Sequence, residues 1–353
     1  MRTGRKFAQI LTFALLGYML ACCSGESYYD ASDFGNVPKI DAHFHYLTMD
    51  VRYMKFAAGL RFRLLNPNWD GEEVTIDDQL SISAAIKRAL PRDYAFFGTF
   101  SADSVWKEGY AAGAIRRIDS CIQLGASGVK IWKNIGMVIK SQDGRYVMID
   151  DPVFAPVFRY LQDNKISVMG HLGEPRDCWL PVDSMIDPGA VSYFTSHPQY
   201  YMYLHPEAPS YDEQIEARDS VLGMYPSIDF IGAHLASLEW SLDEVARHLD
   251  RYPGLKVDLA ARLGPVMYHS DRNRDKVREF FIKYQDRILY GTDFEVHDDP
   301  ATDPEQKMLE LKKGWLDQWI YFTTDSVVGA RGLKLPKEVI DKIYYRNAIK
   351  YFD

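Results

Sequence analysis

Cysteine is scarce in this chain of 353 residues, which contains only four. Cys22 and Cys23 lie near the N-terminus, so Cys121 and Cys178 alone remain for the rest of the chain. The sequence therefore excludes a small domain that depends on a disulfide framework. With 47% hydrophobic and 25% charged residues, the composition is that of a globular protein, which also excludes disorder and collagen-like repeats.

Positive charge is also in deficit. The chain has 41 Lys and Arg against 49 Asp and Glu, a net charge of −8. Arg2, Arg5 and Lys6 precede residue 24, so the remainder has 38 basic against 49 acidic residues and a net charge of −11. An acidic surface repels phosphate backbones, and we expect no binding to nucleic acid.

An apolar run at 7–23 follows a basic start at 1–6. The run is too short to span a bilayer comfortably, and its basic flank is typical of a signal peptide. It ends in Ala21-Cys-Cys-Ser24, which resembles the bacterial lipobox, where a small residue precedes the cysteine that becomes diacylated. Cys22 fits that position best, Cys23 is the alternative, and a plain secretory signal without lipid is the third interpretation.

These features predict an exported protein that is anchored to a bacterial membrane by lipid and faces the periplasm or the cell surface. Residues 1–23 are expected to be the lipoprotein-type signal peptide. Residues 24–36 are expected to be a polar linker. Residues 37–353 are then expected to form one domain.

Short apolar or β-branched segments alternate with longer helical ones after residue 37. We expect strands at 37–43, 60–65, 94–100, 127–132, 166–171, 228–234, 255–260 and 287–293. Helices are expected at 75–90, 107–124, 151–164, 211–225, 241–251 and 273–285. This alternation favours an α/β fold with a parallel sheet, and eight strands over about 250 residues is the size of a (β/α)8 TIM barrel.

A doubly wound open sheet is the alternative fold, but no Gly-x-Gly-x-x-Gly turn follows the first strand. Residues 172–210 are too many for an ordinary connection and are expected to cover an active site at the carboxyl ends of the strands. The tail at 336–352 is expected to be an amphipathic closing helix.

Side chains that bind metals end four of the predicted strands. His43 and His45 close the first strand and point to the same face, because side chains alternate along a strand. Two later strands end at His171 and His234, and the eighth ends in Gly-Thr-Asp293. Several imidazoles with one carboxylate on the barrel rim are typical of a catalytic metal site, and buried, hydrogen-bonded histidines are the alternative.

The order of these residues resembles that of the amidohydrolase superfamily over nearly the whole chain after residue 37. Three segments are similar to the amidohydrolase-2 branch of metal-dependent TIM-barrel hydrolases: Gly125-Ala-Ser-Gly-Val-Lys-Ile-Trp-Lys-Asn-Ile-Gly136, Ile231-Gly-Ala-His-Leu235 and Arg287-Ile-Leu-Tyr-Gly-Thr-Asp293. A barrel whose site has decayed is the alternative to this interpretation.

The resemblance implies that His43, His45 and His171 are metal ligands. It implies that His234 is the ligand of a second metal or a group facing the substrate, and that Asp293 is both a ligand and the catalytic base. Lys130 ends the fourth predicted strand, where several superfamily members have a lysine that carbon dioxide carbamylates and that bridges two metals.

Amidohydrolase-2 proteins often use one metal and no bridge, so one or two divalent ions remain open. Zinc is the expected metal, and manganese is the alternative. An unmodified Lys130 is a cation and would repel a metal ion.

The implied activity is metal-dependent hydrolysis of a lactone, ester or amide, with Asp293 moving the proton as general base and then general acid. His234 would stabilise the developing oxyanion. A decarboxylase or hydratase of the same family is the first alternative. A non-catalytic, lipid-anchored binding protein on the barrel scaffold is the second.

The substrate is expected to be a small molecule from outside the cytoplasm, and a carbohydrate-derived lactone or ester fits an exported enzyme best. Charged residues would bind its polar groups and tryptophans would stack on its ring, although surface charge and core packing are the ordinary roles of such residues. The expected substrate-binding residues are Lys133, Trp132, Glu174 and Arg176, with Trp179, Arg61 and Arg63 as further candidates.

Overall fold

The computed structural model describes residues 26–71 and 74–353. Its main sheet has eight strands: β1 (Lys39–Asp41), β3 (Phe62–Pro67), β4 (Tyr94–Gly98), β5 (Gly128–Ile131), β6 (Ser167–Gly170), β7 (Phe230–Gly232), β8 (Leu255–Asp258) and β9 (Ile288–Leu289). Neighbours in the sheet follow one another along the chain, and every pair is parallel. Each strand coincides with a predicted one, so the predicted (β/α)8 fold is confirmed.

The first and last strands meet and close the sheet. The Ala42 N–H donates to the carbonyl oxygen of Tyr290 at 2.9 Å, and the Asp293 N–H donates to that of His43 at 2.8 Å. Beyond these bonds, β2 (Phe44–Leu47) pairs in parallel with β10 (Phe294–His297). The sequence did not predict this second pair. It holds the two chain segments that contain His43, His45 and Asp293 side by side.

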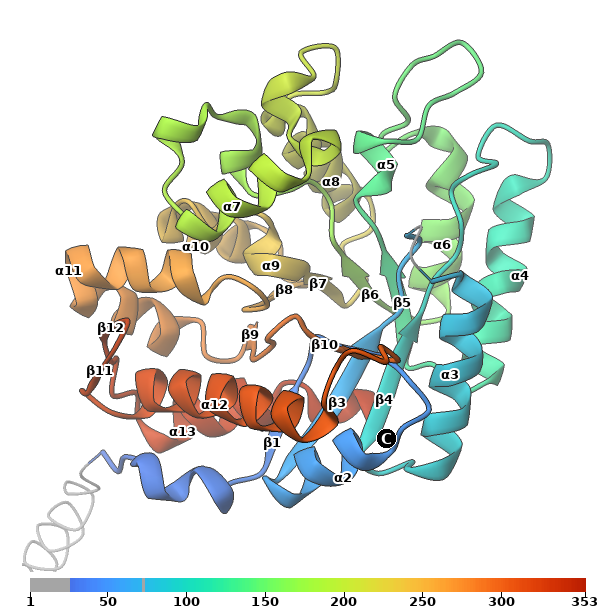
Figure 1. Ribbon diagram of the computed structural model, residues 1–353. Coiled ribbons are helices and arrows are strands. Elements are labelled where there is room, and N and C mark those ends of the chain that lie inside the picture. Colours follow the sequence, from blue (N-terminus) through green and yellow to red (C-terminus); the bar gives the residue numbers. More distant parts are fainter. Residues whose placement is uncertain (1–25, 72–73) are drawn as a thin grey trace, which may run out of the picture.

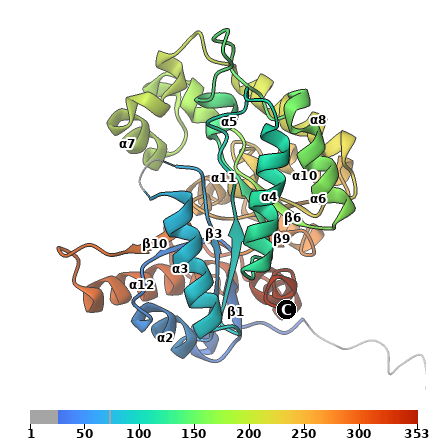
Figure 2. The same ribbon diagram turned by 90° about the vertical axis from the view of Figure 1, so that its right-hand side faces the viewer.

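Helices surround the sheet (Figures 1 and 2). The predicted helices are present as α3 (Ile76–Ala89), α4 (Tyr110–Gln123), α6 (Ala155–Asp163), α8 (Tyr211–Met224), α10 (Leu242–Arg251) and α11 (Leu263–Lys283). Side chains of Thr75, Ser210 and Ser241 cap three of them by accepting backbone hydrogen bonds. The helix α11 begins earlier than predicted, and Asn273, at its predicted start, instead breaks the helical geometry within it.

Three helices of eight or more described residues were not predicted, α2 (Arg52–Gly59), α7 (Pro188–Ser196) and α12 (Pro304–Thr323). The Asp303 side chain caps α12, and Trp315 and Trp319 bury its inner face against the barrel. None of the helices in the described ranges is both long and apolar enough to cross a bilayer.

The C-terminal segment covers the amino end of the barrel. It consists of α13 (Lys337–Asp341), a π-helical turn (Lys342–Arg346) and a 3-10 turn (Ile349–Tyr351), so most of the segment predicted as a helix at 336–352 is helical, but it is interrupted after Arg346. The segment winds inward instead, because Ala348, Tyr351 and Phe352 pack with side chains that fill the barrel interior.

Residues of the expected linker contact this same end of the barrel where the structure describes them. Tyr28 bridges to Pro336, and the 3-10 helix Ala31–Gly35 buries Phe34 against the core. Lys39, at the start of β1, donates to the carbonyl oxygen of Val37 at 2.7 Å and lies over the ring of Phe34. The predicted signal peptide at 1–23 lies outside the described residues, and the domain boundaries stay a prediction.

An excursion follows β6 at the opposite, carboxyl end of the sheet. It contains α7 (Pro188–Ser196) and several short 3-10 turns, which stand above the strand ends in Figure 1. Cys178, Phe194 and Met202 form a small core of its own together with Met137. The long connection predicted at 172–210 therefore folds into a separate layer over the barrel mouth.

Candidate metal centre

Three predicted ligands lie together at the carboxyl ends of the strands. Asp293 Oδ1 lies 3.3 Å from His43 Nε2 and 3.1 Å from His45 Nε2. One ligand atom from each residue lies within 4.8 Å of the others. Asp293 has a left-handed backbone with a φ of 66°, an unfavourable conformation for a residue other than glycine. Its hydrogen bond to the backbone of His43 holds it there.

Asp258, which the sequence analysis did not single out, orients His43. Its Oδ2 lies 2.8 Å from His43 Nδ1, and its Oδ1 accepts the backbone N–H of His234 at 2.7 Å. A carboxylate only accepts hydrogen bonds, so we assign the proton of His43 to Nδ1. This leaves the lone pair of Nε2 directed to the side of the ring that faces Asp293. His43, His234 and Asp258 thus lie close together because Asp258 holds the two histidines in place by hydrogen bonds.

Lys130 contacts His43 of the same cluster. Its Nζ is 2.9 Å from His43 Nε2, and the side chain is almost fully buried at the end of β5. Burial lowers the pKa of Lys130 from 10.5 to about 8, because the interior disfavours the charged ammonium. The unmodified amine of Lys130 forms a hydrogen bond with the Nε2 lone pair of His43, which a metal ion would otherwise use.

His171 and His234 form the other half of the centre. Their rings lie 4.2 Å apart, and the ring of His234 lies 4.8 Å from that of His43. The three-residue cluster does not include His171, whose Nε2 is 3.4 Å from Glu174 Oε2 without forming a hydrogen bond. His234 Nδ1 lies 2.9 Å from the carbonyl oxygen of Ala260, so Nδ1 donates and Nε2 carries the lone pair.

A left-handed turn positions His234. The four residues from His234 to Ser237 all have φ between 55° and 59°. Such a conformation costs roughly 1–2 kcal/mol per residue for residues other than glycine. The Ser237 hydroxyl donates to the carbonyl oxygen of Gly173 at 2.8 Å, which ties this strained turn to the segment after His171.

The imidazoles are in the protonation state that metals require. Burial lowers the pKa of His43, His45 and His234, and it lowers that of His171 to about 4. Burial alone would raise the pKa of Asp293, but the neighbouring His234 and His43 hold it well below its usual range. Neutral imidazoles beside an ionised carboxylate form a donor set suited to a divalent cation.

An unpaired atom supports the same conclusion. His171 Nε2 is buried and has no hydrogen-bond partner among the described residues. Buried polar atoms are nearly always paired, so unpaired ones at a site call for a ligand or another explanation. The residues of the centre therefore fit a metal ion.

The centre opens into a cavity with two adjoining lobes. The tryptophan lobe, about 210 Å³, is lined by His45, Trp69, Lys130, Trp132 and Glu295. The α7 lobe, about 310 Å³, is lined by Glu174, Asp187, Ala190, Phe194 and Arg262. Both lobes share five residues, Lys133, His171, Tyr193, His234 and Asp293. The segment predicted to cover the site thus contributes a wall of the cavity.

Lys133 and Glu174, two predicted substrate-binding residues, form a buried ion pair on this wall. Burial alone would raise the pKa of Glu174, but the Lys133 ammonium lowers it well below its usual range. The ring of Tyr200 lies 4.6 Å from Lys133 Nζ. Each charge is already paired, so the pair shapes the cavity wall as one unit.

Of the other predicted substrate-binding residues, only Trp132 lines the cavity. The Arg176 side chain is exposed and lies over the ring of Trp240 at 4.5 Å, outside both lobes. Trp179 donates to the carbonyl oxygen of Pro209 and packs on the ring of Tyr211. Arg63 lies over aromatic rings of the C-terminal segment, and Arg61 precedes β3 at the amino end of the barrel.

Several residues that the structure places at the centre were not predicted from the sequence. Asp41 accepts hydrogen bonds from the backbone and the hydroxyl of Thr292 and from Trp315, and so links β1 to the chain before Asp293. Trp69 packs edge-on against His45 with ring centroids 4.5 Å apart. Asp41 lies two residues before His43 and Asp258 ends a strand, so both had the signal that identified the histidines.

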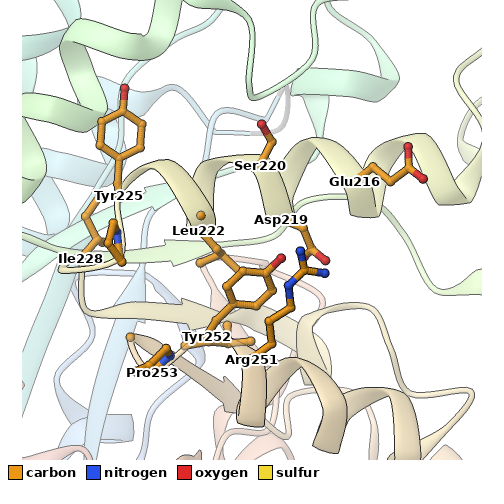
Figure 3. Close-up of a pocket in the computed structure, with 13 residues that line it drawn as sticks. Glu216, Asp219, Ser220, Leu222, Tyr225, Ile228, Arg251, Tyr252 and Pro253 are labelled. Carbon is orange, nitrogen blue, oxygen red and sulfur yellow. The ribbon is translucent and has the colours of Figure 1, made fainter.

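A further cavity lies at the amino end of the barrel (Figure 3). It is about 550 Å³ and is formed by α8 and the segment before β8, with Asp219, Tyr225, Arg251 and Tyr252 in its wall. None of the predicted ligands lines it. Active sites of TIM barrels lie at the carboxyl ends of the strands, so we assign the site to the two-lobed cavity.

Comparisons with known proteins agree with the observed fold and also identify a protein family. An uncharacterised TIM-barrel protein, Bb4693 from Bordetella bronchiseptica, is similar with a TM-score of 0.53 and 16% identity, covering 89% of this chain and 98% of that one. 2,6-Dihydroxybenzoate decarboxylase from Rhizobium gives a TM-score of 0.50 and 13% identity, with coverage of 89% and 98%. At these identities the similarity is one of fold.

A search of curated proteins gave no match. The family model described as amidohydrolase, Amidohydro_2, matches residues 40–353, which include every residue of the cluster described above. The chain belongs to the amidohydrolase family.

Proposed function

We propose that this protein is a metal-dependent hydrolase that attacks the carbonyl of a lactone, ester or amide. The observation that carries this proposal is the cluster of His43, His45 and Asp293, whose ligand atoms lie within 4.8 Å of one another at the base of the cavity. The family match supports an enzyme of this general kind.

His43, His45 and Asp293 would hold the metal ion, with His171 and His234 beside them. A bound divalent cation, which we propose to be zinc, lowers the pKa of water and polarises a carbonyl oxygen. Asp258 keeps the proton of His43 on Nδ1 and so preserves the lone pair on Nε2. Metal-ligating histidines are commonly oriented in this way.

Asp293 is the proposed proton carrier. Both of its contacts with histidines use Oδ1, and its side chain is 30% exposed, so part of the carboxylate reaches the cavity. Oδ2 is then available to accept a proton from the attacking water and to return it to the leaving group.

His234 is proposed as a ligand or proton acceptor. Donation to an oxyanion would require a proton on Nε2, whereas the contact with Ala260 places that proton on Nδ1. Any metal on His43 Nε2 requires Lys130 to lose its charge or to turn away, because an ammonium 2.9 Å from this atom competes with a cation. A second metal beside His234 would in addition need the carbamylated form of Lys130 as a bridge.

The proposed substrate is a carbohydrate-derived lactone or ester. Trp69 and Trp132 line the tryptophan lobe, where the ring of a sugar lactone would meet aromatic surface. Tyr193 adds a third aromatic side chain to both lobes. Arg176 and Trp179 have no part in this proposal, because they lie outside the cavity.

The test is a substrate panel with protein that is stripped of metal and then reloaded with zinc or manganese. We expect hydrolysis of sugar lactones or aryl esters that requires metal and that Asp293→Asn reduces by about 10²-fold or more. Release of carbon dioxide without incorporation of labelled water would identify a decarboxylase instead. Activity on cyclic amides alone would reject the lactone but keep the hydrolase. If the protein turns over none of these substrates, the result would favour a non-catalytic binding protein.

We also propose that the protein is exported and lipid-anchored through Cys22, or through Cys23 as the alternative. Replacing both cysteines by serine should move the protein from the membrane fraction to the soluble one. The same variant should keep its activity, because both cysteines precede the residues 40–353 that the family model matches. Unchanged membrane association of the double variant would contradict the lipid anchor.

A further inference from the structure

Arg262 lies on the wall of the α7 lobe, away from the metal ligands. It sits between β8 and α11, and its side chain is only 10% exposed. It is the one arginine among the described residues that line either lobe. A nearly buried arginine is costly to desolvate and needs a counterpart.

The guanidinium of Arg262 has unused hydrogen-bond donors. Its Nη1 donates to the carbonyl oxygen of Ala261 at 3.0 Å. Its Nε is buried without an acceptor and lies 3.6 Å from Glu239 Oε2, which itself has no donor among the described residues. Arginine has four N–H donors on its two Nη atoms, and only the Nη1 bond to Ala261 uses one of them among the described residues, so Nη donors remain for a ligand in the cavity.

Hydrogen bonds with other residues hold Glu239 in place, so that it can orient the guanidinium of Arg262. Its Oε1 accepts the backbone N–H of Arg176 at 3.2 Å, and its backbone carbonyl faces His269 Nε2 at 2.8 Å. A small rotation of the guanidinium would pair Nε with Oε2. The two Nη groups would then be held in a fixed plane.

The other charges of the α7 lobe are already engaged. Lys133 pairs with Glu174, and Asp187 accepts the backbone N–H of Gly189 at 2.9 Å as the cap of α7. Asp293 belongs to the metal cluster. Arg262 is therefore the charged residue of this lobe that still has free N–H donors. A planar guanidinium group binds a carboxylate through two parallel hydrogen bonds.

We propose that Arg262 binds a carboxylate of the substrate and that Glu239 holds its guanidinium in place. This inference rests on the proposed hydrolase function, since it places the carboxylate at the far end of the molecule whose carbonyl lies at the metal cluster. The substrate class is then a lactone or ester that carries a carboxylate, such as the lactone of a sugar diacid.

The first experiment compares matched substrates that differ only in charge. The pairs are a γ-butyrolactone with a ring carboxylate and the same lactone with a primary amide, and para-nitrophenyl hemiglutarate and the corresponding para-nitrophenyl ester of glutaramic acid. We expect kcat/KM of the wild type to favour the acids. Arg262→Gln should reduce kcat/KM for the acids by about 10²-fold and for the amides by less than about threefold.

Two variants serve as controls in the same assay. Arg262→Lys keeps the charge but loses the planar fork, so we expect an intermediate loss of about tenfold for the acids. Arg251→Gln, which removes an arginine from the cavity at the opposite end of the barrel, should leave both substrate classes unaffected. Equal losses for acids and amides in Arg262→Gln would overturn the proposal.

The second experiment does not depend on catalysis and so separates this inference from the proposed function. Isothermal titration with glutarate and with neutral glutaramide measures carboxylate binding in metal-free protein. We expect Arg262→Gln to weaken glutarate binding by about 10²-fold without changing that of glutaramide. The double variant Arg262→Gln/Glu239→Gln, which leaves no buried charge unpaired, should show the same loss with the fold retained. Equal glutarate affinity in wild type and variants, or none in the wild type, would refute a carboxylate site even if hydrolysis is found.

Discussion

Substitution of Asp258 by asparagine tests how the centre maintains its ligands. Asp258 is fully buried and accepts three hydrogen bonds, from His43 Nδ1 at 2.8 Å, from the His234 N–H at 2.7 Å and from the Ala260 N–H at 3.2 Å. Asparagine has one acceptor oxygen, and its amide nitrogen can only donate. At least one of the three donors must therefore lose its partner.

The size of the effect follows from which donor is lost. If the asparagine oxygen stays with the two backbone groups, its NH₂ faces His43 Nδ1 and forces the proton to Nε2, where it blocks the ligand lone pair. Loss of a supporting partner of this kind weakens metal binding by about 10–100-fold. A buried donor without an acceptor also costs about 1–3 kcal/mol of the free energy of unfolding.

The assay is a zinc competition titration against a chromophoric chelator, combined with thermal unfolding. Asp177→Asn is the matched control, because Asp177 is also buried and accepts the N–H groups of Ile186 and Asp187, at 2.9 and 3.1 Å, without contacting a histidine. Both N–H groups donate to the same oxygen of Asp177, which asparagine keeps, so we expect Asp258→Asn to lose zinc affinity and Asp177→Asn to retain it. Wild-type zinc affinity in Asp258→Asn would refute the supporting role of Asp258.

Three further variants test the scaffold. Burial lowers the pKa of Lys39 from 10.5 to about 7, so between about pH 7 and 10.5 the unfolded chain is protonated at Lys39 and the folded chain is not. The free energy of unfolding should therefore rise with pH over this range. Lys39→Met should flatten that pH dependence in urea unfolding, and an unchanged dependence would contradict the lowered pKa. Asp229 accepts hydrogen bonds from Lys350 at 2.6 Å and Tyr351 at 2.9 Å, so Asp229→Asn should lower the free energy of unfolding by about 1–3 kcal/mol while zinc affinity stays unchanged. A Cβ on Gly232 would lie 2.5 Å from that of Ala236, so Gly232→Ala should displace the left-handed turn and lower both the melting temperature and the zinc affinity. A wild-type melting temperature in this variant would show that the turn can shift without cost.

The strand ends were predictable from sequence because they combine two strong signals. An apolar run of strand length followed at once by a histidine identifies both the strand and the residue it delivers to the rim, as at His171 and His234. Eight apolar runs of strand length, separated by helical segments, sufficed for the fold. The same logic applied to Asp258, which ends β8, but an acidic residue after a strand is common enough to pass unnoticed.

The remaining features depend on contacts between distant segments. The pairing of β2 with β10 joins residues far apart in sequence and follows only from closure of the barrel. The left-handed turn at His234–Ser237 contains no glycine, so nothing in its sequence indicates it. Arg262 and Trp69 lie in loops after strands, where no periodic pattern fixes the direction of a side chain. The helix α12 is different, because Asp303 and Pro304 are ordinary start signals that the prediction overlooked.

The central claim is that His43, His45 and Asp293 bind a catalytic metal ion. Anomalous diffraction from crystals grown with zinc tests it most directly. We expect a peak about 2.0–2.2 Å from His43 Nε2, His45 Nε2 and an oxygen of Asp293, and its loss in Asp293→Asn crystals prepared in the same way. Crystals that show no anomalous peak at this cluster, or that bind zinc only elsewhere on the protein, would contradict it.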